Sequence, residues 1–372
     1  MVRLPAARIS GHPGCVSTLK VALVADSFAP DFDHRARLAR QLTDVLLAAG
    51  QRVSVLTASP GVETYRSADV QRIPGITRRG TLLRSALLDS QADIALVISP
   101  DEFGRKALKQ TMRVGLPATV IEQRPLPGYL PDYYVDQVIA RASRLLVTSR
   151  WVSKALEDRG IAAHVWRPGV DLTAFHPGLR DPALHRAWTK DGRAAVGYAG
   201  DFRRSLGVKR LAALGTIPFA QPVLIGHGPR KTWLKANLTT APLTDPTTTG
   251  DLGTALASLD VLVHPGRQLT DAPDVRAAMA CGVPVVVPTT GGAAEFVRHR
   301  HTGLHFDRRD PLGLAAAVSE LVTDPGLRAQ LAINAFSWSQ AQGWDRQGAA
   351  LIDDHLKAVV GRDPADRVQD VA

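Results

Sequence analysis

The feature that most constrains the fold is a repeated alternation of short apolar runs with helix-like segments, which begins at Lys20. The first run, KVALVA at residues 20–25, has the continuous hydrophobic character of a strand buried in a parallel sheet. The segment after it places Leu38 and Leu42 at helical spacing and ends at Gly50. Runs of the same strand type follow at residues 52–58, 92–100, 117–122 and 142–149. This alternation predicts a doubly wound α/β sheet.

The chain is predicted to form two domains. A segment rich in proline and glycine, RPGVDLTAFHPGLRDP at residues 167–182, interrupts the alternation and has the composition of an interdomain linker. A second series of strand-like runs follows at residues 194–200, 221–229, 259–265, 283–289 and 303–306. At 372 residues, the chain also exceeds the length at which one hydrophobic core keeps growing. We therefore expect two Rossmann-like domains facing each other across a cleft.

We place the boundaries of these domains at residues 18–170 and 171–340. Residues 1–17 are predicted to be a flexible N-terminal extension. Residues 341–372 are expected to return to the first domain as a helix followed by a tail, because Ala349, Ile352 and Leu356 keep helical spacing.

Composition narrows the classes of function. Hydrophobic residues make up 45% of the chain, and no apolar run approaches the roughly 18 residues that span a bilayer. The N-terminus has no apolar core of the kind found in secretory signals. The chain has two cysteines, Cys15 and Cys281, and we do not expect them to form a disulfide. This expectation favours a location in the reducing cytoplasm.

The formal net charge of +10 indicates an anionic partner or serves solubility. The basic residues are scattered and aromatic residues make up 5% of the chain, so we do not expect nucleic-acid binding. Phosphorylated small molecules or an anionic membrane surface suit a diffuse positive field better. The basic residues of two predicted helices are typical either of peripheral contact with the inner face of a membrane or of a solvated face; these residues are Arg35, Arg37, Arg40, Arg105, Lys106 and Lys109.

Five blocks of the chain carry a family resemblance. They are WRPGVDLTAFHP at residues 166–177, VGYAG at 196–200, IGHGP at 225–229, ASLDVLVHPG at 257–266 and AAMACGVPVVVPTTGGAAEFV at 277–297. In order and spacing the blocks resemble the retaining glycosyltransferases of family 4, and most of all the actinobacterial GDP-mannose-dependent α-mannosyltransferases. The resemblance covers nearly the whole chain and is strongest over residues 166–330.

This resemblance implies a GT-B fold, in which the C-terminal domain binds a nucleotide-diphosphate sugar, GDP- or UDP-linked, and the N-terminal domain binds the acceptor. It implies no metal and no other cofactor, so cations and backbone N–H groups must neutralise the departing diphosphate. The family places an Arg and a Lys after the VGYAG strand, where this chain has Asp201 and Leu206. The candidate replacements are Arg203, Arg204 and Lys209. Their pattern favours a solvated helix start, and diphosphate binding is the alternative.

The donor-side carboxylates of the family are also replaced. Its two glutamates, one for the transferred sugar and one for the ribose, correspond to Leu269 and Ala277. Asp271 and Asp274 lie close by and are candidate substitutes, Asp271 in a catalytic role and Asp274 in donor binding. Their spacing around Pro273 favours a capped helix start, with donor contact as the alternative.

Other candidates keep the family pattern. Gly291 and Gly292 can bring bare backbone N–H groups against a phosphate, and Glu295 follows them. His264 ends a predicted strand, and Gly226 begins a turn in the place where relatives form part of the base pocket.

The acceptor side of the N-terminal domain has its own candidates. Glu122 and Gln123 follow a predicted strand in the place where relatives carry polar acceptor-side residues, and we take them as catalytic candidates.

The resemblance therefore implies retaining transfer of a mannose-like hexose to a lipid or glycan acceptor. Because four charged donor positions are replaced together, the alternative is a weakly active or inactive relative. Such a protein would bind a sugar nucleotide or a partner glycosyltransferase.

Overall fold

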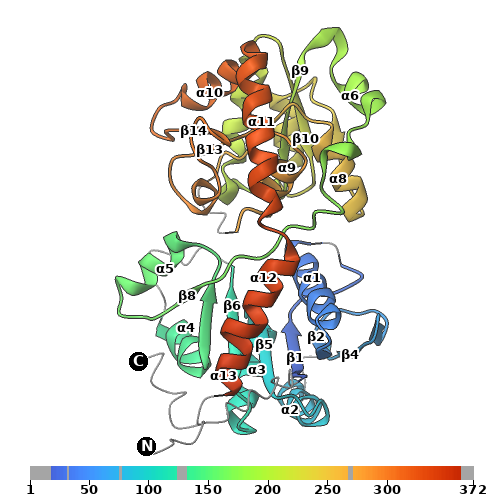
Figure 1. Ribbon diagram of the computed structural model, residues 1–372, viewed down its shortest axis with the longest axis vertical. Helices are drawn as coiled ribbons and strands as arrows, with labels where there is room; N and C mark the ends of the chain where they lie inside the picture. Colours follow the sequence, from blue (N-terminus) through green and yellow to red (C-terminus); the bar gives the residue numbers. More distant parts are fainter. Residues whose placement is uncertain (1–17, 32, 75–77, 124–131, 267–270, 362–372) are drawn as a thin grey trace, which may run out of the picture.

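The computed structural model of the chain describes residues 18–31, 33–74, 78–123, 132–266 and 271–361. The chain forms two lobes, each built on its own sheet with helices on both faces (Figure 1). Every named strand pair is parallel except β3 with β4. The prediction of two doubly wound α/β sheets is confirmed.

The N-terminal lobe contains an eight-stranded sheet in the order β3-β4-β2-β1-β5-β6-β7-β8. Its strands are β1 (Lys20–Ala25), β2 (Arg52–Thr57), β3 (Thr64–Tyr65), β4 (Ala68–Arg72), β5 (Ile94–Ile98), β6 (Ala118–Glu122), β7 (Arg144–Val147) and β8 (His164–Val165). Its helices are α1 (His34–Ala48), α2 (Arg79–Asp89), α3 (Glu102–Arg113), α4 (Asp132–Gln137) and α5 (Arg150–Glu157), with a 3-10 turn η1 (Ile139–Arg141).

The C-terminal lobe contains a six-stranded sheet in the order β11-β10-β9-β12-β13-β14. Its strands are β9 (Ala194–Ala199), β10 (Ala220–Ile225), β11 (Leu243–Thr244), β12 (Val261–Val263), β13 (Val285–Pro288) and β14 (Gly303–Phe306). Its helices are α6 (Pro182–Trp188), α7 (Lys231–Asn237), α8 (Thr249–Ala257), α9 (Pro273–Ala280), α10 (Gly313–Thr323) and α11 (Pro325–Gln340). Its 3-10 segments are η2 (Pro177–Leu179), η3 (Lys190–Gly192), η4 (Arg204–Leu206), η5 (Val208–Thr216) and η6 (Gly292–Glu295).

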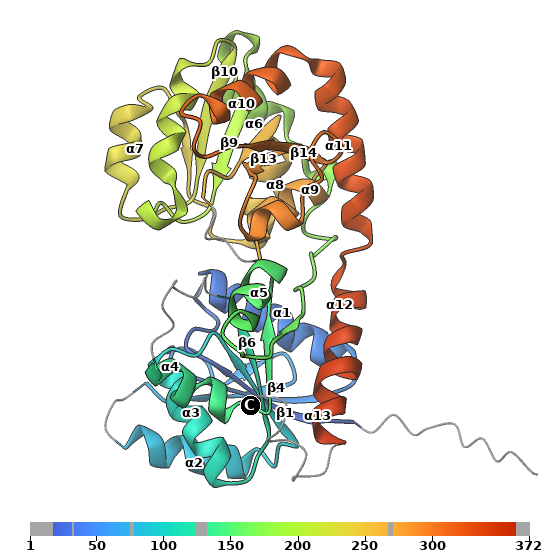
Figure 2. The ribbon, with the colours of Figure 1, turned by 90° about the vertical axis from the view of Figure 1, so that its left-hand side faces the viewer.

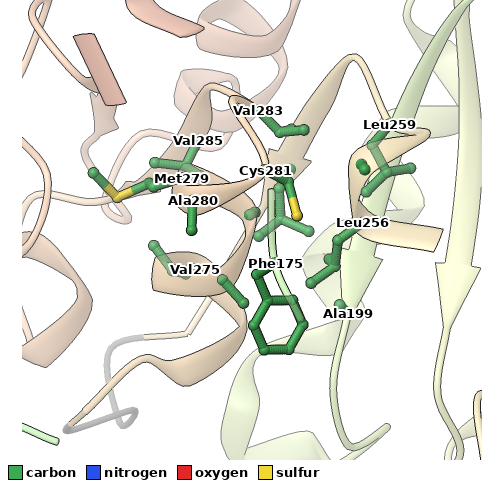
Figure 3. Packing of buried hydrophobic residues seen from close by; sticks show 14 of the residues in the cluster. Phe175, Ala199, Leu256, Leu259, Val275, Met279, Ala280, Cys281, Val283 and Val285 are labelled. Carbon is green, nitrogen blue, oxygen red and sulfur yellow. The ribbon is translucent and has the colours of Figure 1, made fainter. Parts of the chain in front are cut away.

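A buried apolar cluster fixes α8 and α9 against one face of the second sheet (Figure 3). Phe175, from the segment that connects the lobes, packs into this cluster beside Val275 and Leu256. Cys281 is a free thiol within it, and burial raises its pKa to about 12. A thiol with so high a pKa is inert at neutral pH, so Cys281 contributes packing here.

The last helical segments pack on the N-terminal lobe, although α11 belongs to the C-terminal lobe (Figure 2). They are α12 (Trp344–Ala350), a π-helical stretch η7 (Leu351–Lys357) and α13 (Ala358–Val360). Ile352 and Leu356 are buried in the core that also contains β1 and α1. The indole Nε1 of Trp166 donates to the carbonyl oxygen of Gln347 over 3.0 Å.

The chain therefore passes between the lobes twice, and the two crossings touch. Val170 forms an isolated β-bridge with Gly343, and its N–H donates to the carbonyl oxygen of Gln342 over 2.8 Å. In the part of the chain that the structure describes, no helix combines the length and the apolar character needed to cross a bilayer.

Candidate functional site

A cavity of about 260 Å³ lies where the carboxyl ends of the two sheets face each other. This is the position at which open parallel sheets bind ligands. Polar side chains of both lobes line it: Asp33, His34, Arg35, Arg37, Ser99 and Gln123 from the first, and Asp201, Arg203, His227, Asp245, His264, Asp271 and Asp274 from the second.

Helix α1 presents its first turn to the cavity. The carboxylate of the N-cap residue Asp33 accepts hydrogen bonds from the N–H groups of Arg35 and Ala36, at 2.8 and 3.0 Å. Such a cap holds the start of a helix in place. The buried side chains of Leu38 and Leu42 fix the opposite face of the helix on the sheet. The side chains of His34, Arg35 and Arg37 therefore reach the cavity from a rigid element.

Three side chains meet across the interface between the lobes. The Asp271 carboxylate accepts a 2.8 Å hydrogen bond from Gln123 Nε2 and lies 3.2 Å from His34 Nε2. Its side chain is 3% exposed, whereas that of His34 is 34% exposed. The Gln123 side chain also approaches Ser99 at 3.3 Å and His34 at 3.0 Å.

This contact separates the pKa values of its two ionisable groups. Burial opposes ionisation of Asp271, but the charge of His34 and the hydrogen bonds from His34 and Gln123 outweigh it and lower the pKa of Asp271 below 3.8. Burial also opposes protonation of His34, but Asp271 outweighs it and raises the pKa of His34 above 6.5. Each group therefore favours the charged form of the other.

The start of α9 differs from the expected capped helix. Its N-cap residue is Ala272, whose φ of +41° is left-handed, and no side chain caps the helix. Asp271 faces the other lobe instead, and Asp274 Oδ1 lies 3.4 Å from Arg37 Nη2. The capping interpretation of Asp271 and Asp274 is therefore wrong, because their carboxylates turn toward α1 and the cavity.

His264 presents an unpartnered nitrogen in the same cavity. Its side chain is buried and stacks on Tyr198, with the ring centroids 6.2 Å apart. Burial lowers its pKa to about 4, so the ring is neutral at physiological pH. Among the described residues, its buried Nε2 atom has no hydrogen-bond partner. Buried polar atoms are normally paired, so this nitrogen is suited to a ligand.

Two glycines bring backbone close to the cavity. A Cβ atom at Gly226 would lie 2.3 Å from the carbonyl oxygen of Gly200, so only glycine fits at that strand end. Both residues have positive φ, +123° and +126°, which glycine adopts without strain. The ends of β9 and β10 thus form a wall with little side-chain bulk.

The remaining catalytic candidate, Glu122, does not line the cavity with Gln123. Its buried carboxylate accepts a hydrogen bond from the Tyr134 hydroxyl. Of the proposed cations, Arg203 lines the cavity but is 61% exposed, and its Nε lies 3.3 Å from Asp201. Arg204 is exposed outside the cavity, and Lys209 Nζ lies 5.8 Å from the Trp233 ring centroid on another surface.

The glycine pair and the acid after it also lie outside this cavity. Gly291 and Gly292 are buried at the start of η6. The Glu295 carboxylate accepts hydrogen bonds from the N–H groups of Arg150 and Trp151, at 2.9 and 2.6 Å. It also pairs with Arg167 at 2.9 Å. Glu295 therefore joins the C-terminal lobe to the start of α5.

The structure assembles several residues that the sequence did not single out for the site. Four of these residues were not candidates: His34, Tyr198, His227 and Asp245. Two others, Arg35 and Arg37, were expected on a solvated or membrane-facing side of a helix. The sequence signal that could have identified the residues of α1 is the string DHRAR, in which an N-cap aspartate precedes three basic side chains.

The structure describes one of the two positions at which the resemblance expects a glutamate. Ala277 is buried beside a smaller neighbouring cavity, and Leu269 lies outside the described residues. In the described part of the chain, no group of three or more His, Cys, Asp or Glu side chains is arranged to hold a metal ion.

Comparisons with known proteins agree with this architecture. The GDP-mannose-dependent alpha-mannosyltransferase of Mycolicibacterium smegmatis is 30% identical over 375 residues, covering 92% of this chain and 98% of that protein. The protein of the same name from Mycobacterium tuberculosis is 28% identical over 378 residues, with coverage of 92% and 98%. A D-inositol 3-phosphate glycosyltransferase of Salinispora arenicola is 29% identical over 259 residues, covering 62% of this chain and 58% of that protein.

Among solved structures, the sucrose-phosphate synthase of Thermosynechococcus elongatus superposes with a TM-score of 0.78 at 19% identity, covering 92% of this chain and 99% of that one. This likeness establishes the GT-B fold. A family model described as glycosyl transferases group 1 matches residues 207–324. Together with the relatives that match over nearly their whole length, it places the chain: the protein belongs to the group 1 glycosyl transferase family.

Proposed function

We propose that this protein transfers a mannose-like hexose from a nucleotide-diphosphate sugar, with retention of configuration, to a lipid or glycan acceptor. The observation that carries this proposal is the cavity between the lobes, in which the buried His264 Nε2 is unpartnered and the Asp271 carboxylate faces the first lobe. The M. smegmatis relative is GDP-mannose-dependent by name, which makes GDP-mannose the first donor to test.

In this proposal the C-terminal lobe, residues 171–340, is the donor-binding domain. The backbone at Gly200 and Gly226 allows close approach of the nucleotide, and Asp274 contributes an acceptor oxygen for a hydroxyl group. The neutral His264 Nε2 accepts a hydrogen bond from a hydroxyl group of the donor. These contacts replace those that Leu269 and Ala277 do not supply.

The N-terminal lobe, residues 18–170, is the acceptor-binding domain, to which residues 341–372 return. Gln123 and Asp271 lie between the two substrates and orient the acceptor hydroxyl and the sugar. The bond between the anomeric carbon and the diphosphate oxygen breaks, and its electron pair stays on that oxygen. The acceptor oxygen bonds to the anomeric carbon on the same face, and its proton leaves with the diphosphate.

Two observations argue that donor affinity is modest. Asp201 lines the cavity beside Arg203, so it repels a diphosphate and competes for the guanidinium. Ala277 offers no acceptor for the ribose hydroxyl groups, which removes about 1.5–3 kcal/mol of charged hydrogen bonding. The alternative of an inactive relative is less favoured, because Asp271 and His264 provide polar groups within the cavity itself.

Calorimetric titration of the purified protein with GDP, UDP, GDP-mannose and UDP-glucose tests the donor assignment. We expect one nucleotide series to bind with a Kd between about 1 μM and 1 mM. Incubation with that donor and a membrane lipid extract is then expected to give a glycosylated lipid by mass spectrometry. Failure of every nucleotide and nucleotide sugar to bind at millimolar concentration would contradict the proposal.

The proposed location is the cytoplasm, with peripheral contact at the inner face of the membrane. In the N-terminal lobe, α3 packs against both α2 and α4. These three helices carry the exposed side chains of Leu82, Met112 and Tyr133. The Arg105 guanidinium lies 5.4 Å from the Tyr133 ring centroid, and Lys109 is exposed on the same helix as Met112. Sedimentation with phosphatidylglycerol vesicles is expected to be stronger than with phosphatidylcholine vesicles and to weaken in Lys109→Glu.

A further inference from the structure

Two of the three arginines that line the cavity among the described residues come from the acceptor-side lobe. Of the described residues that line it, the arginines are Arg35 and Arg37 on α1 and Arg203 after β9. The family resemblance places its cations after β9, where this chain has Asp201 and Leu206. The positive charge that a diphosphate needs is therefore offered from the opposite side of the cleft.

Arg37 is the best placed of these three arginines. Its side chain is 18% exposed, so water screens its charge less than at an outer surface. Its guanidinium contacts Asp274, whose Oδ2 atom lies 3.2 Å from the position of a Cβ at Gly200. Arg37 thus extends from α1 to the immediate surroundings of the β9 end, where Gly200 has no side chain.

Arg35 lies two residues earlier, also in the first turns of α1. Its guanidinium pairs with the Asp101 carboxylate, and its side chain is 39% exposed. A guanidinium has five N–H donors in a planar fork, so one that holds a carboxylate can also donate to a phosphate oxygen. Arg35 and Arg37 both line the cavity, so each can contact a diphosphate bound there.

The cations of the donor-side lobe are less suited. All three arginines contact an aspartate, but Arg203 is 61% exposed, so water screens its charge more than that of Arg35 or Arg37. Arg204 and Lys209 do not line the cavity. Leu206 does line it and carries no charge.

We infer that Arg35 and Arg37 bind the diphosphate of the donor and stabilise the charge that develops on it as the glycosidic bond to phosphate breaks. This inference rests on the proposed function and specifies which residues of the site perform that part of it. Since both arginines belong to the acceptor-side lobe, leaving-group stabilisation requires the two lobes to be apposed. A donor bound to the C-terminal lobe alone would lack it.

The test compares GDP, GMP and guanosine by calorimetry with the unmodified protein and with Arg35→Ala, Arg37→Ala, Arg37→Lys and Arg203→Ala. Arg84→Ala is the matched control, because Arg84 is exposed on α2 of the same lobe and does not line the cavity. We expect Arg37→Ala to weaken GDP binding about tenfold to a hundredfold and guanosine binding less than threefold. Arg37→Lys should recover part of the GDP affinity, and Arg84→Ala should change neither. If UDP binds more tightly than GDP, the series uses UDP, UMP and uridine.

Thermal unfolding within a few degrees of the unmodified protein establishes that each variant is folded. GDP affinity that survives both Arg35→Ala and Arg37→Ala, or a larger loss in Arg203→Ala, would overturn this inference and leave the proposed function in place. An equal loss of GDP and guanosine affinity in Arg37→Ala would also overturn it. Absence of any nucleotide binding by the unmodified protein would overturn the proposed function and this inference together.

Discussion

At the scale of single residues, the site depends on an ion pair formed between the lobes. Asp271 is buried and touches two groups of the opposite lobe, His34 and Gln123. A buried carboxylate without such partners would be costly, so apposition of the lobes and ionisation of Asp271 support each other.

The first prediction concerns the pH dependence of this pair. The raised pKa of His34 means that its contribution is complete below 6.5 and is lost as the pH rises through the raised value. The lowered pKa of Asp271 means that its contribution is complete above 3.8 and is lost as the pH falls through the lowered value. His34→Gln should therefore lower the free energy of unfolding by about 1 kcal/mol at pH 5.5, since His34 is partly exposed, and by less at pH 9.

Urea unfolding followed by tryptophan fluorescence at the two pH values measures this difference. The matched control is His301→Gln, because the His301 side chain is exposed and in no ion pair with a described residue. An effect of His34→Gln that is the same at pH 5.5 and pH 9 would show that the ion pair contributes nothing.

The second prediction concerns His264. Because its ring is neutral and its Nε2 unpartnered, His264→Ala should weaken GDP-mannose binding about two- to tenfold, the range for one neutral hydrogen bond. The change should be the same at pH 5.5 and pH 8.5, since a pKa of about 4 lies below both. Calorimetry at the two pH values measures it, and a loss only at the lower pH would mean that the ring binds as a cation.

At this scale the sequence predicted some residues of the cavity and misjudged the surroundings of others. Gln123, His264, Asp271 and Asp274 were recognised because a known motif or strand end flanks them. His34 was missed because its partner Asp271 lies in the other lobe, and periodicity along the chain carries no information on such a contact.

At the scale of elements, the start of α5 is held by the other lobe. Ser149 is its N-cap and accepts from the N–H of Val152, while the carboxylate of Glu295 accepts from the first two N–H groups of the helix. A carboxylate at a helix N-terminus also interacts favourably with the helix dipole. This contact and the pairing with Arg167 make Glu295 an anchor between η6 and α5.

The third prediction follows from this anchor. Glu295→Gln should speed amide hydrogen exchange at residues 150–153 and lower the free energy of unfolding by about 1–3 kcal/mol, because charged hydrogen bonds are lost. Hydrogen-exchange mass spectrometry measures the local effect, and denaturant unfolding the global one. Glu320→Gln is the control, since its pair with Arg300 is largely exposed and should contribute less than 1 kcal/mol. Unchanged exchange at α5 in Glu295→Gln would refute the anchor.

The sequence predicted the apolar strands well and the very short or polar strands poorly. β1, in the interior of its sheet, and β14, at the edge of its sheet, were predicted with their observed bounds, since both are mostly apolar and buried. β4 was missed because its sequence ADVQR has no such run, and β3 and β11 have two residues each. Strands of this kind acquire their conformation from the neighbouring strand, which a local pattern does not contain.

At the scale of the whole molecule, charge is distributed unevenly. The chain has a formal net charge of +10, whereas the described lining of the cavity contains five aspartates and three arginines. The overall field attracts a nucleotide toward the protein, and the local groups decide how it is held.

The fourth prediction separates these two effects. The association rate of GDP should fall several-fold between about 20 mM and 500 mM salt, because screening shortens the reach of the overall field. Stopped-flow fluorescence with a labelled GDP measures the rate, and labelled guanosine is the uncharged control. An association rate that rises with salt would mean that the aspartates of the cavity dominate the approach.

The double crossing between the lobes has a mechanical consequence. The segment that precedes α6 and the turn that precedes α12 both pass between the lobes (Figure 1). They are joined where Val170 forms its bridge with Gly343. A single flexible connection would allow the lobes to rotate about any axis. Two adjacent connections restrict this rotation, as two attachment points of a hinge do. Two connections favour opening about the line that joins them, since twisting one lobe against the other would strain the hydrogen bond between Val170 and Gln342. Closure about such an axis would bring the first turn of α1 to the same strand ends each time.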